Sequence, residues 1–305
     1  MSPNLNPPSM SIDARSARIL NKNNIKTVAL LSTLTGALVV VGSVFGGRGG
    51  ATIGLVLGLA MVGGSYWFSD RLAVRAAGAK PLEVGELSWV IDDLARLSTR
   101  AGLPTPRLYL SPSMQPNAFA TGRNERHAVV CVTAGLLAVL ERDEVAAVMA
   151  HELGHIKNRD ILIGSIAAAI ATGITYVAQM AMFSSMFGGS DDDDAPNPIA
   201  LILMMLLAPL AASLIQAALS RSREFEADRV GAAIAGDGTS LARALQKIEA
   251  HAARVPMDVN PAQAAAYIVN PLTGRRVQFA RLFLTHPPTD ERVARLTGRA
   301  IATAS

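Results

Sequence analysis

The middle of the chain contains the sequence His151-Glu152-Leu153-Gly154-His155. This spacing can form a metal site if the segment is helical. Residues i and i+4 of an α-helix lie one turn apart on the same face, so both imidazoles can reach one metal ion. Glu152 points about 100° away around the axis and can take a proton from a water molecule beside that metal. The pattern therefore predicts a helix carrying part of a zinc site, although two histidines on a surface helix would look the same.

A catalytic zinc ion needs three protein ligands and an open position, so a third ligand must come from elsewhere. Residues 220–228 read Ser-Arg-Ser-Arg-Glu-Phe-Glu-Ala-Asp, and Glu224 and Asp228 again share one helix face. Glu224 is the predicted third ligand. Asp228 is expected to accept a hydrogen bond from the outer nitrogen of a ligand histidine. Glu226 points to another face and is the weaker candidate, and a solvated charged turn would have the same composition.

The composition indicates a membrane protein. Half of the 305 residues are hydrophobic, 17% are charged, and the mean hydropathy is +0.31, whereas soluble domains contain about a quarter charged residues. Four runs of 21 to 30 residues contain no charge, and about 20 apolar residues cross a bilayer. They predict four transmembrane helices, since a buried hairpin that is apolar on every face would have few partners in so short a chain. The runs are 27–47, 49–69, 161–190 and 195–220.

Basic residues beside the ends of membrane spans mark the cytoplasmic side. Four precede the first run, three follow the second and two follow the fourth, whereas the short connections hold only Arg48 and the acidic run Asp191–Asp194. Both termini and the candidate site are therefore expected on the cytoplasmic face of the cell inner membrane. The basic residues are Arg15, Arg18, Lys22, Lys26, Arg71, Arg75, Lys80, Arg221 and Arg223.

The expected fold class is α+β, mainly helical. Hydrophobic periodicity predicts helices over 83–101 and 143–159, one that ends near 235 and one around 241–248, and alternation predicts strands at 117–122 and 127–132 after an extended piece near 108. The chain then divides into five parts. These are a flexible tail (1–25), two transmembrane helices (26–69), a first catalytic part (70–160), a transmembrane hairpin with an acidic external loop (161–220), and a second catalytic part with the third ligand (221–305).

Four stretches resemble the HtpX and CAAX-prenyl-protease family of membrane metalloproteases. They are residues 151–155, residues 224–228, Pro116–Gly122 and His286-Pro287-Pro288-Thr289-Asp290-Glu291-Arg292. Four spans, with a hairpin between the two zinc helices, are similar to HtpX in particular, and the resemblance covers residues 25–300. It implies a gluzincin-like zinc metalloprotease domain with a small edge-strand sheet, one Zn²⁺ per chain, and the same third ligand and partner carboxylate as above.

The resemblance also implies roles that the residues alone leave open. His286 is implied to stabilise the tetrahedral oxyanion and Arg292 to hold the site together, although a histidine before two prolines could equally belong to a plain loop. The edge strand with Asn117, Ala118 and Phe119 is implied to line the substrate backbone. The implied activity is that of a metalloendopeptidase acting on membrane-bound or unfolded polypeptides in membrane protein quality control.

Two other functions share parts of this pattern. A site-2-type intramembrane protease also has a His-Glu-x-x-His helix, but it takes an Asp from a later apolar span, and here Asp237-Gly238 lies in a polar stretch. A non-catalytic zinc-binding membrane protein would place ionisable groups inside its spans, and the four runs have none. Nucleic acid is excluded as a partner because no Lys/Arg cluster is interleaved with aromatics. Cys131 is expected in the core, and a homo-oligomer is compatible with the sequence.

Overall fold

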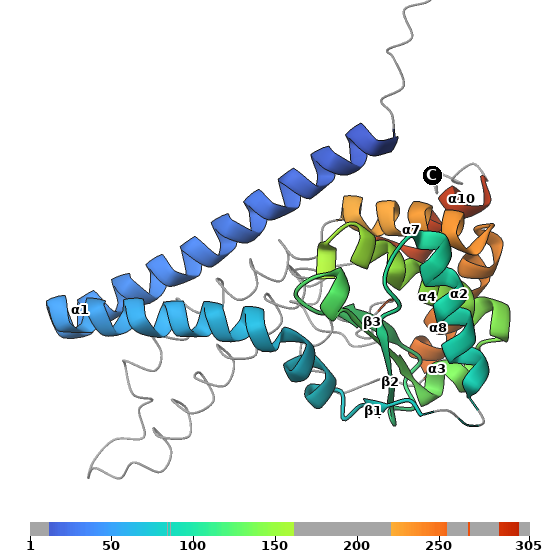
Figure 1. The fold of residues 1–305 in the computed structure, drawn as a ribbon, viewed down its shortest axis with the longest axis horizontal. Helices are drawn as coiled ribbons and strands as arrows, with labels where there is room; N and C mark the ends of the chain where they lie inside the picture. Colours follow the sequence, from blue (N-terminus) through green and yellow to red (C-terminus); the bar gives the residue numbers. More distant parts are fainter. Residues whose placement is uncertain are drawn as a thin grey trace, which may run out of the picture.

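The computed structural model describes residues 12–83, 85, 87–161, 221–254, 268 and 287–298. A long helical arm, α1, projects from a body in which helices cover a small sheet (Figure 1). Residues 162–220, with the predicted third and fourth spans and the Asp191–Asp194 loop, lie outside the described residues, and so does His286.

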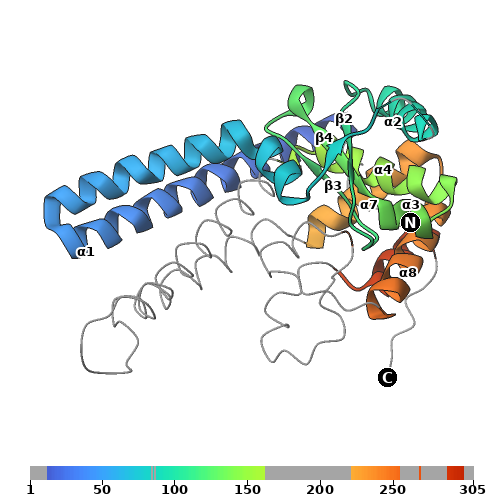
Figure 2. The same ribbon diagram turned by 90° about the horizontal axis from the view of Figure 1, so that it is seen from below.

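Helix α1 (Ile12–Ala76) begins inside the predicted tail and folds back on itself (Figures 1 and 2). The two halves of α1, called its outgoing and returning arms, meet near Gly47. The φ of Gly47 is 55°, in the left-handed region that glycine adopts without strain. Beyond this turn, a Cβ on Gly54 would clash with the carbonyl oxygen of Leu38, and one on Gly58 would lie 3.0 Å from Thr35. The two glycines therefore allow the arms to touch, as small residues do between membrane helices.

A second break divides the returning arm. Between the segments Gly47–Met61 and Tyr66–Ala76 the helix axis turns by 66°, across Gly63-Gly64-Ser65, residue types at which helices bend. Among the described residues, no single helix has both the length and the apolar composition that a membrane crossing needs, but these two segments meet that test when taken together. The predicted second run, 49–69, is thus not one straight helix. Its first part exposes Ile53, Leu55, Val56, Leu57 and Leu59.

Four short strands form one mixed sheet in the order β1-β2-β4-β3. β3 pairs antiparallel with β4, which confirms the predicted strand pair, whereas β2 and β4 run parallel. All five residues of β4 are buried, including Cys131, as expected for a core cysteine, and β3 lies at the edge of the sheet. The strands are β1 (Lys80–Pro81), β2 (Arg107–Ser111), β3 (Ala118–Thr121) and β4 (Val129–Thr133).

Helix α4 is the centre of the body and contacts α2, α7, α8 and the edge strand β3. Eleven of its sixteen residues are buried, whereas an amphipathic helix on a protein surface buries only one face. The predicted helices are confirmed, with ends that differ by up to six residues, whereas α3 and α10 were not predicted, because six and nine residues are too few to establish a helical period. The helices are α2 (Ser88–Ala101), α3 (Ala134–Val139), α4 (Arg142–Lys157), α7 (Arg221–Ala235), α8 (Thr239–Arg254) and α10 (Thr289–Thr297).

Helices α4 and α7 pack backbone against backbone because glycines face the partner helix at their crossing. A Cβ on Gly231 would lie 2.8 Å from the Cα of His151, and a Cβ on Gly154 would lie 3.0 Å from the carbonyl oxygen of Ala227. The first distance is shorter than Cβ atoms tolerate, so the helices would have to separate. Glycine therefore brings α7 directly against the histidine-bearing part of α4.

Helix α4 ends at Lys157, two residues earlier than predicted, and does not continue unbroken toward Ile161. Arg159 has a φ of 57° and is the one non-glycine residue with positive φ in the part of the chain that the structure describes. A left-handed residue after a helix reverses the direction of the chain. This reversal brings Asp160 back beside the last turn of α4, where its carboxylate lies 3.2 Å from His155.

Replacing Gly231 with alanine should force α7 away from α4. Overpacking of a tight core contact costs about 1–3 kcal/mol, so the midpoint of chemical unfolding should fall accordingly. Gly49→Ala is the matched control, because a Cβ there meets nothing within 4 Å and its φ is not positive. Equal stability of the Gly231→Ala variant and the wild type would contradict the close packing.

Candidate metal centre

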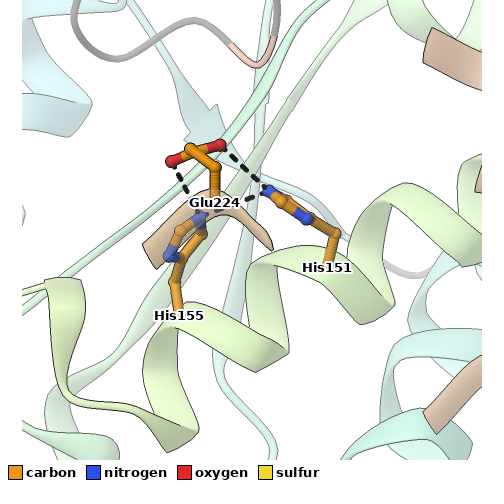
Figure 3. Close-up of side chains that lie close together, drawn as sticks. All are labelled: His151, His155 and Glu224. Carbon is orange, nitrogen blue, oxygen red and sulfur yellow. Dashed lines mark hydrogen bonds and ion pairs between the residues drawn. The ribbon is translucent and has the colours of Figure 1, made fainter. Parts of the chain in front are cut away.

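Three side chains from two helices meet at one point in the interior (Figure 3). His151 and His155 project from α4, and Glu224 from the first turn of α7. The two histidine Nε2 atoms are 3.2 Å apart. The Glu224 oxygens lie 3.8 Å from His151 Nε2 and 3.6 Å from His155 Nε2. The structure thus brings together the three ligands that the sequence predicted, although Glu224 follows His155 by 69 residues along the chain.

These distances fit a single zinc ion. Zinc binds imidazole nitrogen at about 2.0–2.1 Å and carboxylate oxygen at about 2.0–2.2 Å, so two ligand atoms on one tetrahedral ion stand about 3.3–3.5 Å apart. The separations of 3.2 to 3.8 Å lie around that value. Two imidazoles and one carboxylate also leave a fourth position open, as a catalytic site requires. The side chain of His155 is 17% exposed, whereas those of His151 and Glu224 are 1% and 6% exposed.

The outer nitrogen of each histidine faces a carboxylate. His151 Nδ1 lies 3.0 Å from Asp228 Oδ1, and His155 Nδ1 lies 3.2 Å from Asp160 Oδ2. A proton held on Nδ1 leaves the Nε2 lone pair free for a metal. Asp228 was predicted for this position, but Asp160 was missed. Asp160 follows His155 by five residues, so on a continuous helix the two side chains would lie on different faces. They come into contact only because the chain reverses direction at Arg159.

The surroundings of the two imidazoles shift their pKa values in opposite directions. Burial lowers the pKa of His155, but the hydrogen bond with Asp160 and the charge of Glu224 outweigh this effect and raise it to about 9. The pKa of His151 is lowered, chiefly because its ring is fully desolvated, although Asp228 opposes this shift. His151 is therefore favoured in the neutral form that binds a metal, whereas His155 must lose a proton when a metal binds.

Glu152 interacts with two of the candidate ligands, His155 and Glu224, and with the edge strand β3. Its side chain is buried, and burial raises its pKa to about 7, with Glu224 adding to the shift and His155 opposing it. A hydrogen bond from the backbone of Ala120 on β3 stabilises the carboxylate. A carboxyl group that titrates near neutrality can both accept and release a proton at physiological pH.

Arg292 joins three segments in the interior and is 1% exposed. Its Nε and Nη2 donate to the two oxygens of Asp228 at 2.8 and 2.7 Å, and its Nη1 donates to the carbonyl of Ile268 at 2.9 Å. Burial raises the pKa of Asp228, but Arg292 outweighs it and lowers that pKa to about 2. Arg292 thus holds Asp228, which in turn orients His151, and this arrangement supports the role inferred from the sequence.

Asn117 belongs to the same interior network. Its Oδ1 accepts a hydrogen bond from the backbone N–H of Ile268 at 3.0 Å, and its own N–H donates to Thr133 Oγ1 at 2.9 Å. The side-chain oxygen is therefore engaged within the protein, and the residue is buried. Of the predicted substrate contacts, Ala118 and Phe119 lie on the edge strand β3.

Comparison with known proteins places this geometry in a family. Residues 81–300 match the sequence profile described as Peptidase family M48. The chain belongs to peptidase family M48. It is accordingly a metalloprotease, a hydrolase of peptide bonds, and the family implies a metal cofactor. Membership in M48 favours this reading over the site-2-type alternative and over a non-catalytic zinc-binding protein.

Curated relatives of this M48 peptidase share about half of its sequence. Protease HtpX homologues from Desulfatibacillum aliphaticivorans, Pelotomaculum thermopropionicum and Syntrophotalea carbinolica are 49%, 48% and 50% identical over 277 to 282 residues. These alignments cover 90–92% of this chain and 89–100% of the relatives. The crystal structure of S. mikatae Ste24p has a TM-score of 0.50 at 20% identity, covers 92% of this chain and 67% of that one, and supports the fold alone.

Replacing Arg292 with methionine should leave the Asp228 carboxylate buried without its cation. Breaking a buried ion pair from one side costs about 3–5 kcal/mol, and the free energy of unfolding in detergent should fall by that amount. Arg229→Met is the matched control, since Arg229 also pairs with a carboxylate, that of Glu226 at 2.6 Å, but is 51% exposed. The Arg229→Met substitution should lower the free energy of unfolding by only about 0–1 kcal/mol. Similar losses in both variants would show that the burial of Arg292 does not matter.

Proposed function

We propose that the chain is an integral-membrane zinc endopeptidase that cleaves membrane-bound or unfolded polypeptides at the cytoplasmic face, in membrane protein quality control. The observation that carries this proposal is the convergence of His151, His155 and Glu224 beside the buried carboxyl of Glu152. Relatives that are 48–50% identical are named HtpX-type proteases, which supports the same activity here. Zinc is the metal that two imidazoles, one carboxylate and an open position suit best.

The residues of the site divide the chemistry between them. Bound zinc would supply Lewis acidity, which lowers the pKa of water toward neutrality and polarises the scissile carbonyl. Glu152 accepts the proton of the attacking water and then donates it to the leaving amine nitrogen. Asp228 and Asp160 keep the two imidazoles oriented while charge develops. His286 is proposed to stabilise the oxyanion, and it lies outside the described residues.

The edge strand β3 is suited to hold an extended substrate. Among the residues that the structure describes, it pairs with β4 on one side only, and its Ala120 contacts the carboxylate of Glu152. A polypeptide that adds to this edge by main-chain hydrogen bonds would pass beside the proposed proton carrier. Only an extended segment can pair in this way, which favours unfolded or loosely folded substrates over compact ones.

The sequence carries the membrane part of the proposal. The third uncharged run begins six residues after His155, and Glu224 follows the end of the fourth run by four residues. Both ligand helices therefore adjoin predicted spans, and the basic residues beside them favour the cytoplasmic side. The site-2 alternative gains no support, because Asp237 uses its Oδ1 to accept the N–H of Thr239 at the start of α8.

Substitution of Glu224 should separate the two candidate ligands. Glu224→Ala should lose the bound zinc, because it removes the carboxylate that faces both histidines. Glu226→Ala should retain about one zinc per chain, since Glu226 faces away and pairs with Arg229. Metal content of the purified variants, measured by atomic absorption, checks this. If only Glu226→Ala lost zinc, Glu226 and not Glu224 would be the third ligand.

Substitution of Glu152 by glutamine should separate catalysis from metal binding. The amide keeps the size of the side chain but cannot carry the proton, so turnover of an unfolded membrane protein should fall by a factor on the order of 10²–10⁴. Zinc content and the unfolding midpoint should stay close to those of the wild type. Near-normal cleavage by this variant would overturn the proposed mechanism.

A further inference from the structure

The last segment of α1, Tyr66–Ala76, carries an exposed stripe that the protease chemistry does not use. Trp67, Phe68 and Leu72 are 59%, 49% and 48% exposed, although each is a large apolar side chain. Arg71 and Arg75 follow Trp67 at intervals of four residues, so they extend the same helix face. An exposed face of aromatic, aliphatic and basic residues is typical of helices that lie in a membrane interface.

The opposite face of this segment is fixed to the sheet. Asp70 is buried and accepts a hydrogen bond from Arg107 of β2 at 2.6 Å. The carbonyl of Ser69 accepts a hydrogen bond from Thr121 Oγ1 of β3 at 3.4 Å. These contacts prevent the segment from rotating its apolar side chains inward. The fold therefore keeps the exposed stripe on the surface.

The turn between β3 and β4 adds a third arginine to this surface. The guanidinium of Arg123 lies 4.9 Å from the ring centroid of Trp67, and that of Arg71 lies 5.7 Å from the ring of Phe68. Within the described ranges, neither of these arginines nor Arg75 forms an ion pair with a carboxylate. Other exposed arginines of the body do form such pairs, among them Arg96, Arg142, Arg229, Arg243 and Arg295.

We propose that Tyr66–Ala76 is an interfacial helix that binds the headgroups of anionic phospholipids. Trp67 and Phe68 would lie at the boundary of the acyl chains, and Arg71, Arg75 and Arg123 would contact the lipid phosphates. Charge complementarity selects this partner, because three arginines that pair with no carboxylate in the described part of the chain surround an apolar stripe. The inference rests on the proposed membrane location.

The bend in α1 agrees with this placement. The segment before the break, Gly47–Met61, is 15 residues long and spans about 22 Å as a helix, less than the roughly 30 Å of a hydrocarbon core. The 66° turn that follows gives Tyr66–Ala76 an axis different from that of this segment, as expected for an interfacial helix next to a membrane-inserted one. Because the segment is tied to β2 and β3, lipid binding there would also set the height of the edge strand above the bilayer.

Fluorescence quenching by brominated lipids tests the proposal on the full-length chain. The chain has two tryptophans, so Trp89→Phe leaves Trp67 as the single reporter. The protein is reconstituted in equal mixtures of phosphatidylcholine and phosphatidylglycerol, with bromine on one lipid or on the other. We expect phosphatidylglycerol to be enriched around Trp67 by a factor on the order of five.

Variants then assign this preference to the three arginines. Joint replacement of Arg71, Arg75 and Arg123 by glutamine should abolish the enrichment, and replacement by lysine should retain it because the charge is kept. The matched control removes three paired arginines instead and should leave the enrichment unchanged. It combines Arg96→Gln, Arg229→Gln and Arg243→Gln.

Two results would overturn the proposal. Equal quenching by the two lipids would remove the preference for anionic headgroups, and absence of quenching by either lipid would remove the interfacial placement. Zinc content and substrate cleavage, measured on the same preparations, test the protease function separately. Lost cleavage together with an intact lipid preference would contradict that function and leave this proposal standing.

Discussion

Helices α4 and α7 lie so close that their crossing leaves no room for a methyl group at Gly231. Most of the remaining structure depends on this contact. It brings Glu224 within 4 Å of two histidines that precede it by about 70 residues, and it sets the short separations that one metal ion requires. Side chains larger than glycine would separate the helices, and the carboxylate would no longer reach the imidazoles.

The close contact buries several charges, and each must find a partner in the interior. Arg292 and Asp228 form a bidentate ion pair, and Asp228 also faces His151. The pair is therefore both a structural link between α7 and α10 and the support of a candidate ligand. An uncompensated charge at this depth would cost several kcal/mol, so the orientation of His151 depends on the docking of α10.

The sheet connects this centre to the predicted membrane region. Its edge strand β3 reaches Glu152 through Ala120 and reaches the end of α1 through Thr121. A single short strand thus contacts the proposed proton carrier and the segment that follows the bend in α1. Movement of α1 relative to the body would be transmitted to β3, because few residues separate these contacts.

The sequence alone determined the two ligand helices, the edge strand pair and the identity of the three converging side chains. Each depends on local spacing: i and i+4 on a helix, and alternation along a strand. Asp160 as the partner of His155, Asn117 as a link to Ile268, the bend in α1 and the arginines around Trp67 were decided only by the tertiary structure. They arise from a reversal at a left-handed residue, from hydrogen bonds between distant segments and from helix docking. Such contacts join residues whose spacing along the chain carries no periodic signal.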